Sequence, residues 1–176
     1  MRQNFMRWSV LLLCIVASCS NGIVNEPYDD ADIRARTYQS LYSELRLDTL
    51  GYDIMAVAEG DSLERGFFWP ASFQRHPDAL FDALAAMLPI RIVGMDEVVS
   101  VNEASTNPPY VTRDTDEAVI PVFTNGIGRR DETHLTVICG VHLPHVLSAY
   151  GACNLAYADG NWQVTDIQFY YLRESL

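Results

Sequence analysis

Two runs in the last third of the chain decide the fold: HLTVICGV at residues 134–141 and CNLAYADGNWQV at residues 153–164. Apolar residues alternate with polar or small ones in both runs, as in strands with one buried face. An antiparallel pairing that sets Cys139 opposite Cys153 also gathers the apolar side chains on that face. The other facing pairs are Leu135 with Tyr157 and Val137 with Leu155. One register thus predicts an apolar face and a disulfide; two buried free thiols are the alternative.

The second run ends in Asp159-Gly160, a sequence typical of a two-residue hairpin turn, which returns the chain through 161–172. This hairpin sets Trp162 opposite Tyr157, and it also puts Asp166 on the apolar side. A bulge near Thr165-Asp166 removes the conflict and is the favoured interpretation. Without the bulge, Asp166 lies in an apolar cup, where desolvation raises a carboxyl pKa and suits the group to acid–base catalysis.

Upstream of these runs, β-branched residues predict further strands at 90–95 and 98–102, either separate or joined through a bend at Asp96-Glu97. Residues 118–124 predict another strand, in which Pro121 favours an edge position or a bulge. The segments 103–115 and 125–133 are expected to be a loop and a polar turn region.

Helical patterns lie closer to the N-terminus. Asp29 and Asp30 can cap a helix that runs to about Leu47, because Ile33, Thr37, Leu41 and Leu45 recur every four positions on one face. A second helix is expected after Pro77, with an apolar stripe from Leu80 to Leu88 and a stop at Pro89. Residues 49–75 give no clear pattern, and Phe67-Phe68-Trp69 is interpreted as core-lining.

Together these segments predict one α+β domain at 29–176, with two N-terminal helices packed on a curved antiparallel sheet of about four to five strands. The order of elements, with the closing YADGNWQV at residues 157–164, is similar to cystatin-like and NTF2-like folds. That resemblance implies a cone-shaped sheet. In NTF2-like enzymes it implies an acid inside the cone, for which Asp166 is the candidate.

The N-terminus carries a different kind of signal. Arg2 and Arg7 precede the apolar run at 8–17, which is too short to span a bilayer and has the length of a signal-peptide core. The run closes in Val16-Ala17-Ser18-Cys19, which resembles the lipobox of bacterial lipoproteins. The resemblance implies that residues 1–18 are a signal peptide, that Cys19 carries lipid including palmitate, and that 19–28 is a tether. A cleaved signal without lipid is the alternative.

Ser20 follows the cysteine. In Gram-negative lipoproteins a residue other than Asp at this position implies sorting to the outer membrane. The resemblance therefore implies a place in the cell envelope, on the periplasmic face of the outer membrane.

The charge balance limits the possible partners. All twelve basic residues are arginines, against 23 acidic residues, for a net charge of −11; removal of residues 1–18 takes away two arginines and no acid, which gives −13. Nucleic acid is therefore not an expected partner, because its binding needs clustered cations. The remaining expected partners are the membrane, through the lipid, and an envelope protein or a small ligand.

No metal or cofactor is expected. His142 and His145 are spaced like a metal pair on a helix, but Pro144 opposes a helix there. The acidic groups at 29–32 and 114–117 are better explained as a helix cap and a solvated loop than as calcium sites.

Three functions fit the sequence. The first is a non-enzymatic, lipid-anchored binding module, with a periplasmic immunity-type protein as one version. The second is a small cavity enzyme of the NTF2-like kind that uses Asp166. The third is a structural component of the envelope whose partner is another lipoprotein or a porin.

Overall fold

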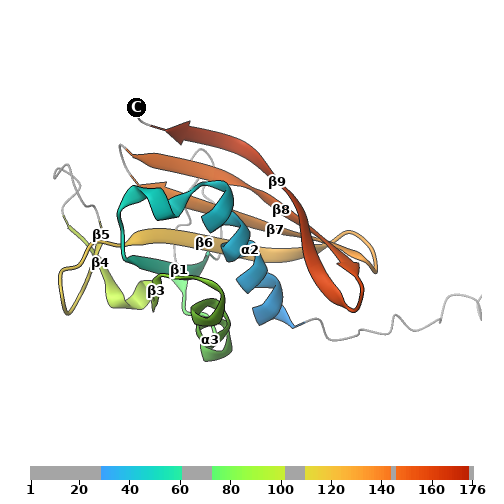
Figure 1. Cartoon of the computed structure of the whole chain (residues 1–176), viewed down its shortest axis with the longest axis horizontal. Helices are drawn as coiled ribbons and strands as arrows, with labels where there is room; N and C mark the ends of the chain where they lie inside the picture. Colours follow the sequence, from blue (N-terminus) through green and yellow to red (C-terminus); the bar gives the residue numbers. More distant parts are fainter. Residues whose placement is uncertain (1–28, 61–72, 102–109, 144–145, 175–176) are drawn as a thin grey trace, which may run out of the picture.

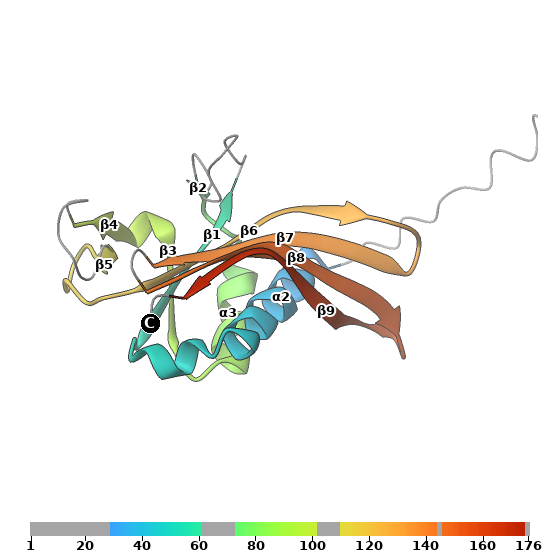
Figure 2. The same ribbon diagram turned by 90° about the horizontal axis from the view of Figure 1, so that it is seen from above.

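The computed structural model describes residues 29–60, 73–101, 110–143 and 146–174. Two helices cover one face of a seven-stranded sheet, and a separate two-stranded sheet lies at one end (Figures 1 and 2). The helices and 3-10 turns are α2 Asp30–Glu44, η1 Leu47–Leu50, α3 Asp78–Met87 and η2 Met95–Glu97. The strands are β1 Ile54–Gly60, β2 Phe73–Gln74, β3 Arg91–Gly94, β4 Val98–Ser100, β5 Tyr110–Thr112, β6 Ile120–Arg129, β7 His134–Leu143, β8 Leu147–Ala158 and β9 Asn161–Glu174. The α+β class is therefore confirmed.

The sheet is mixed rather than antiparallel, and it has more strands than the predicted four to five. Its order is β2-β1-β6-β7-β8-β9, with β3 also paired to β1. The strand β1 runs parallel to both β3 and β6, so it lies inside the sheet. It was not predicted because its residues Ile54–Ala58 are all buried, and a strand buried on both faces shows no alternation.

The two predicted helices are confirmed. The side chain of Asp29 accepts hydrogen bonds from the amides of Ala31 and Asp32, which satisfies free donors at the start of α2. In α3, Pro77 takes the cap position just before the first turn. The buried face of α2 packs on the sheet, and α3 packs beside it on β3.

The C-terminal hairpin forms as predicted. Asp159 and Gly160 both have positive φ, 54° and 82°, as a two-residue turn matching the strand twist requires. Trp162 lies opposite Tyr157 in the resulting ladder. The strand pair is confirmed in register as far as Val164 opposite Leu155.

The predicted register between β7 and β8 is wrong by two residues. Cys139 lies opposite Gly151, and Cys153 lies opposite Val137. The short connection that sets Leu143 opposite Leu147 fixes this register, since loop length determines pairing in a hairpin. A shift by two leaves each side chain on its predicted face, so Leu135, Val137 and Cys139 are all buried together.

The alternative of separate strands at 90–95 and 98–102 is confirmed, whereas the predicted turn region at 125–133 and the predicted place of Pro121 need correction. The segments at 90–95 and 98–102 belong to different sheets, because η2 redirects the chain between β3 and β4. The strand β6 runs on to Arg129, so most of the predicted turn region at 125–133 is strand. Pro121 lies inside the sheet and opposite Ala56, not at an edge. Proline has no N–H to donate to a neighbouring strand. This is tolerated at Pro121 because the pairing of β6 with β7 begins at the next residue, Val122.

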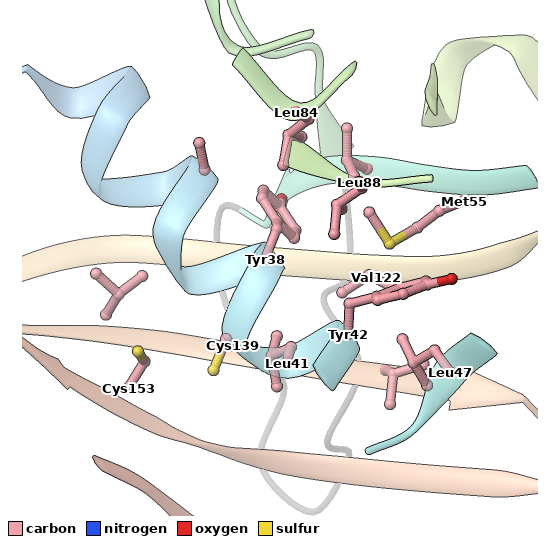
Figure 3. Packing of buried hydrophobic residues seen from close by; sticks show 14 of the residues in the cluster. Tyr38, Leu41, Tyr42, Leu47, Met55, Leu84, Leu88, Val122, Cys139 and Cys153 are labelled. Carbon is pink, nitrogen blue, oxygen red and sulfur yellow. The ribbon is translucent and has the colours of Figure 1, made fainter. Parts of the chain in front are cut away.

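The main core lies between α2, α3 and the sheet. Figure 3 shows Tyr38, Leu41 and Tyr42 of α2 directed toward the strands, with Met55 and Val122 among the residues they meet. A smaller cluster is centred on alternate residues of β1. It comprises Ile54, Ala56, Val93, Val98 and Val119. Across the described ranges, no helix has the length and apolar character needed to cross a bilayer.

Candidate functional site

Arg34 is the centre of a buried polar cluster. Its side chain is 5% exposed and lies on the face of α2 that meets the sheet. The guanidinium donates through Nε to Asp30 at 2.9 Å and through Nη2 to Glu59 at 2.6 Å. Through Nη1 it donates to the hydroxyl of Thr124 at 2.9 Å and the carbonyl of Asn125 at 3.1 Å. One side chain therefore joins α2 to β1 and β6.

Tyr38 and His76 extend this cluster one helical turn further. The Tyr38 hydroxyl lies 2.9 Å from the Ala58 carbonyl, 2.8 Å from His76 Nε2 and 3.2 Å from the Thr124 hydroxyl. Thr124 accepts from Arg34 and can therefore give its own proton to Tyr38. Tyr38 then donates to Ala58 and accepts from His76 Nε2–H. In this arrangement His76 Nδ1 carries a lone pair, and it has no hydrogen-bond partner among the described residues.

Both aromatic groups of the cluster are neutral near pH 7. Burial, together with the nearby Arg34 cation, lowers the pKa of His76 to about 4. Burial raises the pKa of Tyr38 well above its ordinary value. His76 is 2% exposed and Tyr38 is not exposed at all. The cluster therefore holds α2 on the sheet, and its proton-carrying groups do not face solvent.

The second feature is the side of β7, β8 and β9 that faces away from the helices, here called the helix-free face (Figure 2). A row of side-chain hydrogen bonds crosses it: Thr136 donates to Asn154 at 3.0 Å, and Asn154 donates to Asp166 at 3.1 Å. The face includes Thr136, Ile138, Tyr150, Asn154, Asp166 and Tyr170. All six are at least partly exposed.

Two tyrosines give this face an aromatic part. The rings of Tyr150 and Tyr170 lie 5.9 Å apart, and Tyr170 is 56% exposed. Nearby, His142 and Ser148 form a hydrogen bond of 2.8 Å. Tyrosine offers a large contact area together with a polar group, which suits binding surfaces. The helix-free face can therefore meet a partner with both apolar and polar contacts.

Asp166 lies on the helix-free face because the predicted bulge forms. Asn154 pairs with Asp166 and Leu155 pairs with Val164, so Thr165 is the extra residue of β9. Asp166 is exposed and its carboxylate accepts from Asn154. The bulge also returns Ile167 to the side of Cys153. Asp166 therefore lies outside the apolar cup expected for it without the bulge.

Cys139 and Cys153 are buried under α2 and are free thiols (Figure 3). With Cys139 opposite Gly151, the two cysteines are diagonal neighbours, a relation that sets Cα atoms about 7–8 Å apart. A disulfide spans less than about 7 Å, so a bond here requires backbone movement. The disulfide remains a prediction. Burial raises the pKa of Cys153 to about 11 and that of Cys139 further.

Other predicted residues take ordinary positions. His134 is exposed and bonds to Asp131, and the amide of Thr133 together with His134 lowers the pKa of Asp131 to about 2. Glu117 pairs with Arg91 at 3.0 Å. No group of three or more metal-binding side chains occurs in the part of the chain that is described. Cys19, Ser20, His145 and Phe67-Phe68-Trp69 lie outside it.

The buried cluster was not predicted from the sequence. A signal for Arg34 existed, because it lies between Ile33 and Thr37 on a helix face that is otherwise apolar, four residues after Asp30. A charged residue in that place indicates a buried pair. His76 had no such signal, since it follows a segment without a readable pattern.

Comparison of the chain with protein families, with curated proteins and with solved structures gave no match. The geometry and the sequence therefore carry the functional argument.

Proposed function

We propose that this chain is a non-enzymatic, lipid-anchored protein of the bacterial envelope that binds a protein partner through its helix-free face. The observation that carries this proposal is the partly exposed row of Thr136, Asn154 and Asp166 beside the Tyr150–Tyr170 pair. Helices cover the opposite side of the same strands, so this side is left for contacts outside the described core (Figure 2).

The anchor is proposed from the sequence of residues 1–19. Cleavage before Cys19 leaves a tether that ends at Asp29, the cap of α2. Nine residues between them reach at most about 30 Å, so the folded domain stays close to its membrane. Two or more acyl chains on Cys19 are enough for stable attachment. Ser20 supports sorting to the outer membrane.

The partner we propose is a basic protein. The net charge of −11, or −13 without residues 1–18, attracts cationic surfaces at long range and repels anionic headgroups and nucleic acid. Asp166 places one carboxylate within the face itself. A periplasmic immunity-type protein that neutralises a basic toxin is one version of this function.

The alternative, a cavity enzyme of the NTF2-like kind, depends on a buried Asp166. The exposed carboxylate lacks the desolvation that would adapt it to acid–base chemistry. The binding function is therefore the better supported of the two.

Site-specific photo-crosslinking tests the binding face. A photoreactive amino acid replaces Tyr170 on the helix-free face and, as the matched control, Gln39 on the exposed side of α2. Apart from any cross-link to a second copy of this acidic chain, we expect one basic protein to be cross-linked from position 170 and not from position 39. The yield should fall as salt rises, because screening weakens charge attraction.

A second substitution makes the test specific. Tyr150→Ala removes the ring that contacts Tyr170 and should reduce the cross-link from position 170. Equal cross-linking from positions 39 and 170, or none from either, would contradict the proposed face.

A further inference from the structure

The strand β9 forms an outer edge of the sheet. It is the last strand in the sheet order, and among the described residues no strand pairs with its outer side (Figure 1). Its 14 residues, Asn161–Glu174, make it the longest strand of the structure. A free edge presents backbone N–H and C=O groups to which another strand can pair.

The strand β9 has two of the usual protections of an edge, bulges and charged side chains, but it lacks others. Its sequence, NWQVTDIQFYYLRE, contains no proline and no lysine. Two of the largest exposed apolar side chains, Tyr170 at 56% and Leu172 at 49%, lie on it. Two bulges interrupt its pairing with β8, one at Thr165 and one between Phe169 and Tyr171. The second bulge changes which side chains of β9 lie on the same face of the sheet.

Asp166 and Arg173 lie on one face because of that second bulge. Seven residues apart, they would occupy opposite faces of a regular strand. Instead Asp166 pairs with Asn154 and Arg173 pairs with Ser148, two positions on the same face of β8. In the same way, Ile167 and Leu172 lie together on the helix side, since they pair with Cys153 and Ala149.

This arrangement is complementary to itself. If β9 pairs antiparallel with β9 of a second copy, about a two-fold axis through the second bulge, Asp166 lies opposite Arg173 of the other copy. Ile167 then lies opposite Leu172. Each contact occurs twice, because the axis repeats it. Opposite charges and apolar pairs facing each other across strands are stabilising.

Arg173 is available for such a contact. It is exposed and forms no ion pair within the described ranges, although the chain carries 23 acidic residues. Asp166 is exposed as well and, among the described residues, accepts hydrogen bonds from the uncharged side chains of Asn154 and Thr165. Neither charge has a counter-ion in the described part of one chain, and a second copy supplies it.

We propose that two copies of this chain associate through the outer edges of their β9 strands to form one continuous sheet, with Asp166 of each copy paired to Arg173 of the other. The inference does not depend on the proposed function. The axis is perpendicular to the sheet, so both helix-free faces point the same way and stay open.

Cysteine cross-linking in the full-length chain tests the register. The variant Gln168→Cys/Tyr171→Cys places two thiols opposite each other across the proposed axis, so mild oxidation should give a covalent dimer. The control Gln168→Cys/Gln39→Cys carries the same number of added thiols with one on the exposed side of α2, and it should stay monomeric. Equal dimer yields from the two variants, or no dimer from the first, would overturn the proposal.

Charge exchange tests the pairing. Asp166→Arg or Arg173→Asp is added separately to the Gln168→Cys/Tyr171→Cys variant. Each should raise the dissociation constant of the dimer about tenfold, because the two-fold axis places like charges opposite each other at two positions. The double exchange Asp166→Arg/Arg173→Asp should restore the dimer, which separates lost pairing from lost folding. Dimer yields unaffected by either single exchange would refute the register.

Discussion

Arg34 and Arg36 lie two residues apart on α2 and show how burial changes the effect of the same side chain. Arg34 is 5% exposed and has partners on three elements, whereas Arg36 is 31% exposed and, within the described ranges, pairs with Asp32 alone. Removing a buried charge leaves its partners unpaired, while an exposed pair within one helix contributes little.

We therefore expect Arg34→Met to lower the free energy of unfolding by about 2 kcal/mol. The matched control Arg36→Met should lower it by about 0.5 kcal/mol. Urea unfolding followed by circular dichroism measures both values. Equal effects of the two substitutions would show that the cluster does not hold α2 to the sheet.

His76 predicts a dependence of stability on pH. Its pKa of about 4 in the folded chain is below the ordinary value of 6.5. Between these values the unfolded chain takes up a proton that the folded chain does not, so stability falls as pH drops from about 6.5 and levels off below about 4. From pH 7 to pH 5 the loss is on the order of 2 kcal/mol.

The substitution His76→Gln should remove most of that dependence, while His134→Gln at an exposed position should leave it in place. Part of the slope should remain in both variants, because burial also lowers the pKa of His142. Chemical unfolding at pH 7, 6 and 5 gives the three slopes. A slope unchanged by His76→Gln would mean that this ring is protonated at little cost in the fold.

At the scale of elements, close packing between β6, β7 and β8 depends on a glycine. A Cβ atom built at Gly140 would lie 2.7 Å from both the Phe123 ring and the Ala149 carbonyl, whereas one at Gly128 would lie 3.6 Å from its nearest neighbour. We expect Gly140→Ala to destabilise the fold by about 2 kcal/mol through overpacking. Gly128→Ala should be nearly neutral, and thermal unfolding compares the two. A neutral Gly140→Ala would mean that Phe123 can move aside.

Local signals explain which elements could be predicted. The Asp159-Gly160 turn, the bulge at Thr165 and the cap at Asp29 each involve residues close in sequence, and all three are confirmed. The parallel strand β1 could not be predicted, since a uniformly buried strand lacks alternation. The β7–β8 register was wrong by two residues because that shift keeps the same faces, so hydrophobic pattern alone cannot distinguish the two.

The site was less predictable than the fold. The sequence identified Asp166 as a candidate acid. The bulge at Thr165 is the reason that its side chain is exposed. Arg34, Tyr38 and His76 come together from segments far apart, and the hydrogen bonds to Thr124 depend on the position of β6 beside β1. Contacts of this kind follow from the order of the strands in the sheet. The alternation of apolar and polar residues within a single strand does not reveal that order.

At the scale of the whole molecule, the proposed lipid anchor gives the broadest prediction. Cys19→Ala should abolish palmitate labelling and shift the protein from the membrane to the soluble fraction, or leave it as uncleaved precursor. Because the domain is acidic, it should have little affinity of its own for anionic lipids. Membrane retention of an unlabelled variant from which residues 1–18 have been cleaved would rule out the acyl chains as the anchor.

The position of β1 between β3 and β6 also sets the order in which the chain can fold. Ala56 pairs with Pro121, 65 residues later, so this pairing waits until that stretch has been synthesised. At about 5–20 residues per second, the delay is roughly 3–13 s. The hairpins from β6 to β9 need only local contacts and form much faster once made. Throughout that interval the apolar segment at 54–58 has no strand partner from β6, so a holding chaperone would act on this nascent N-terminal half and not on the late hairpins.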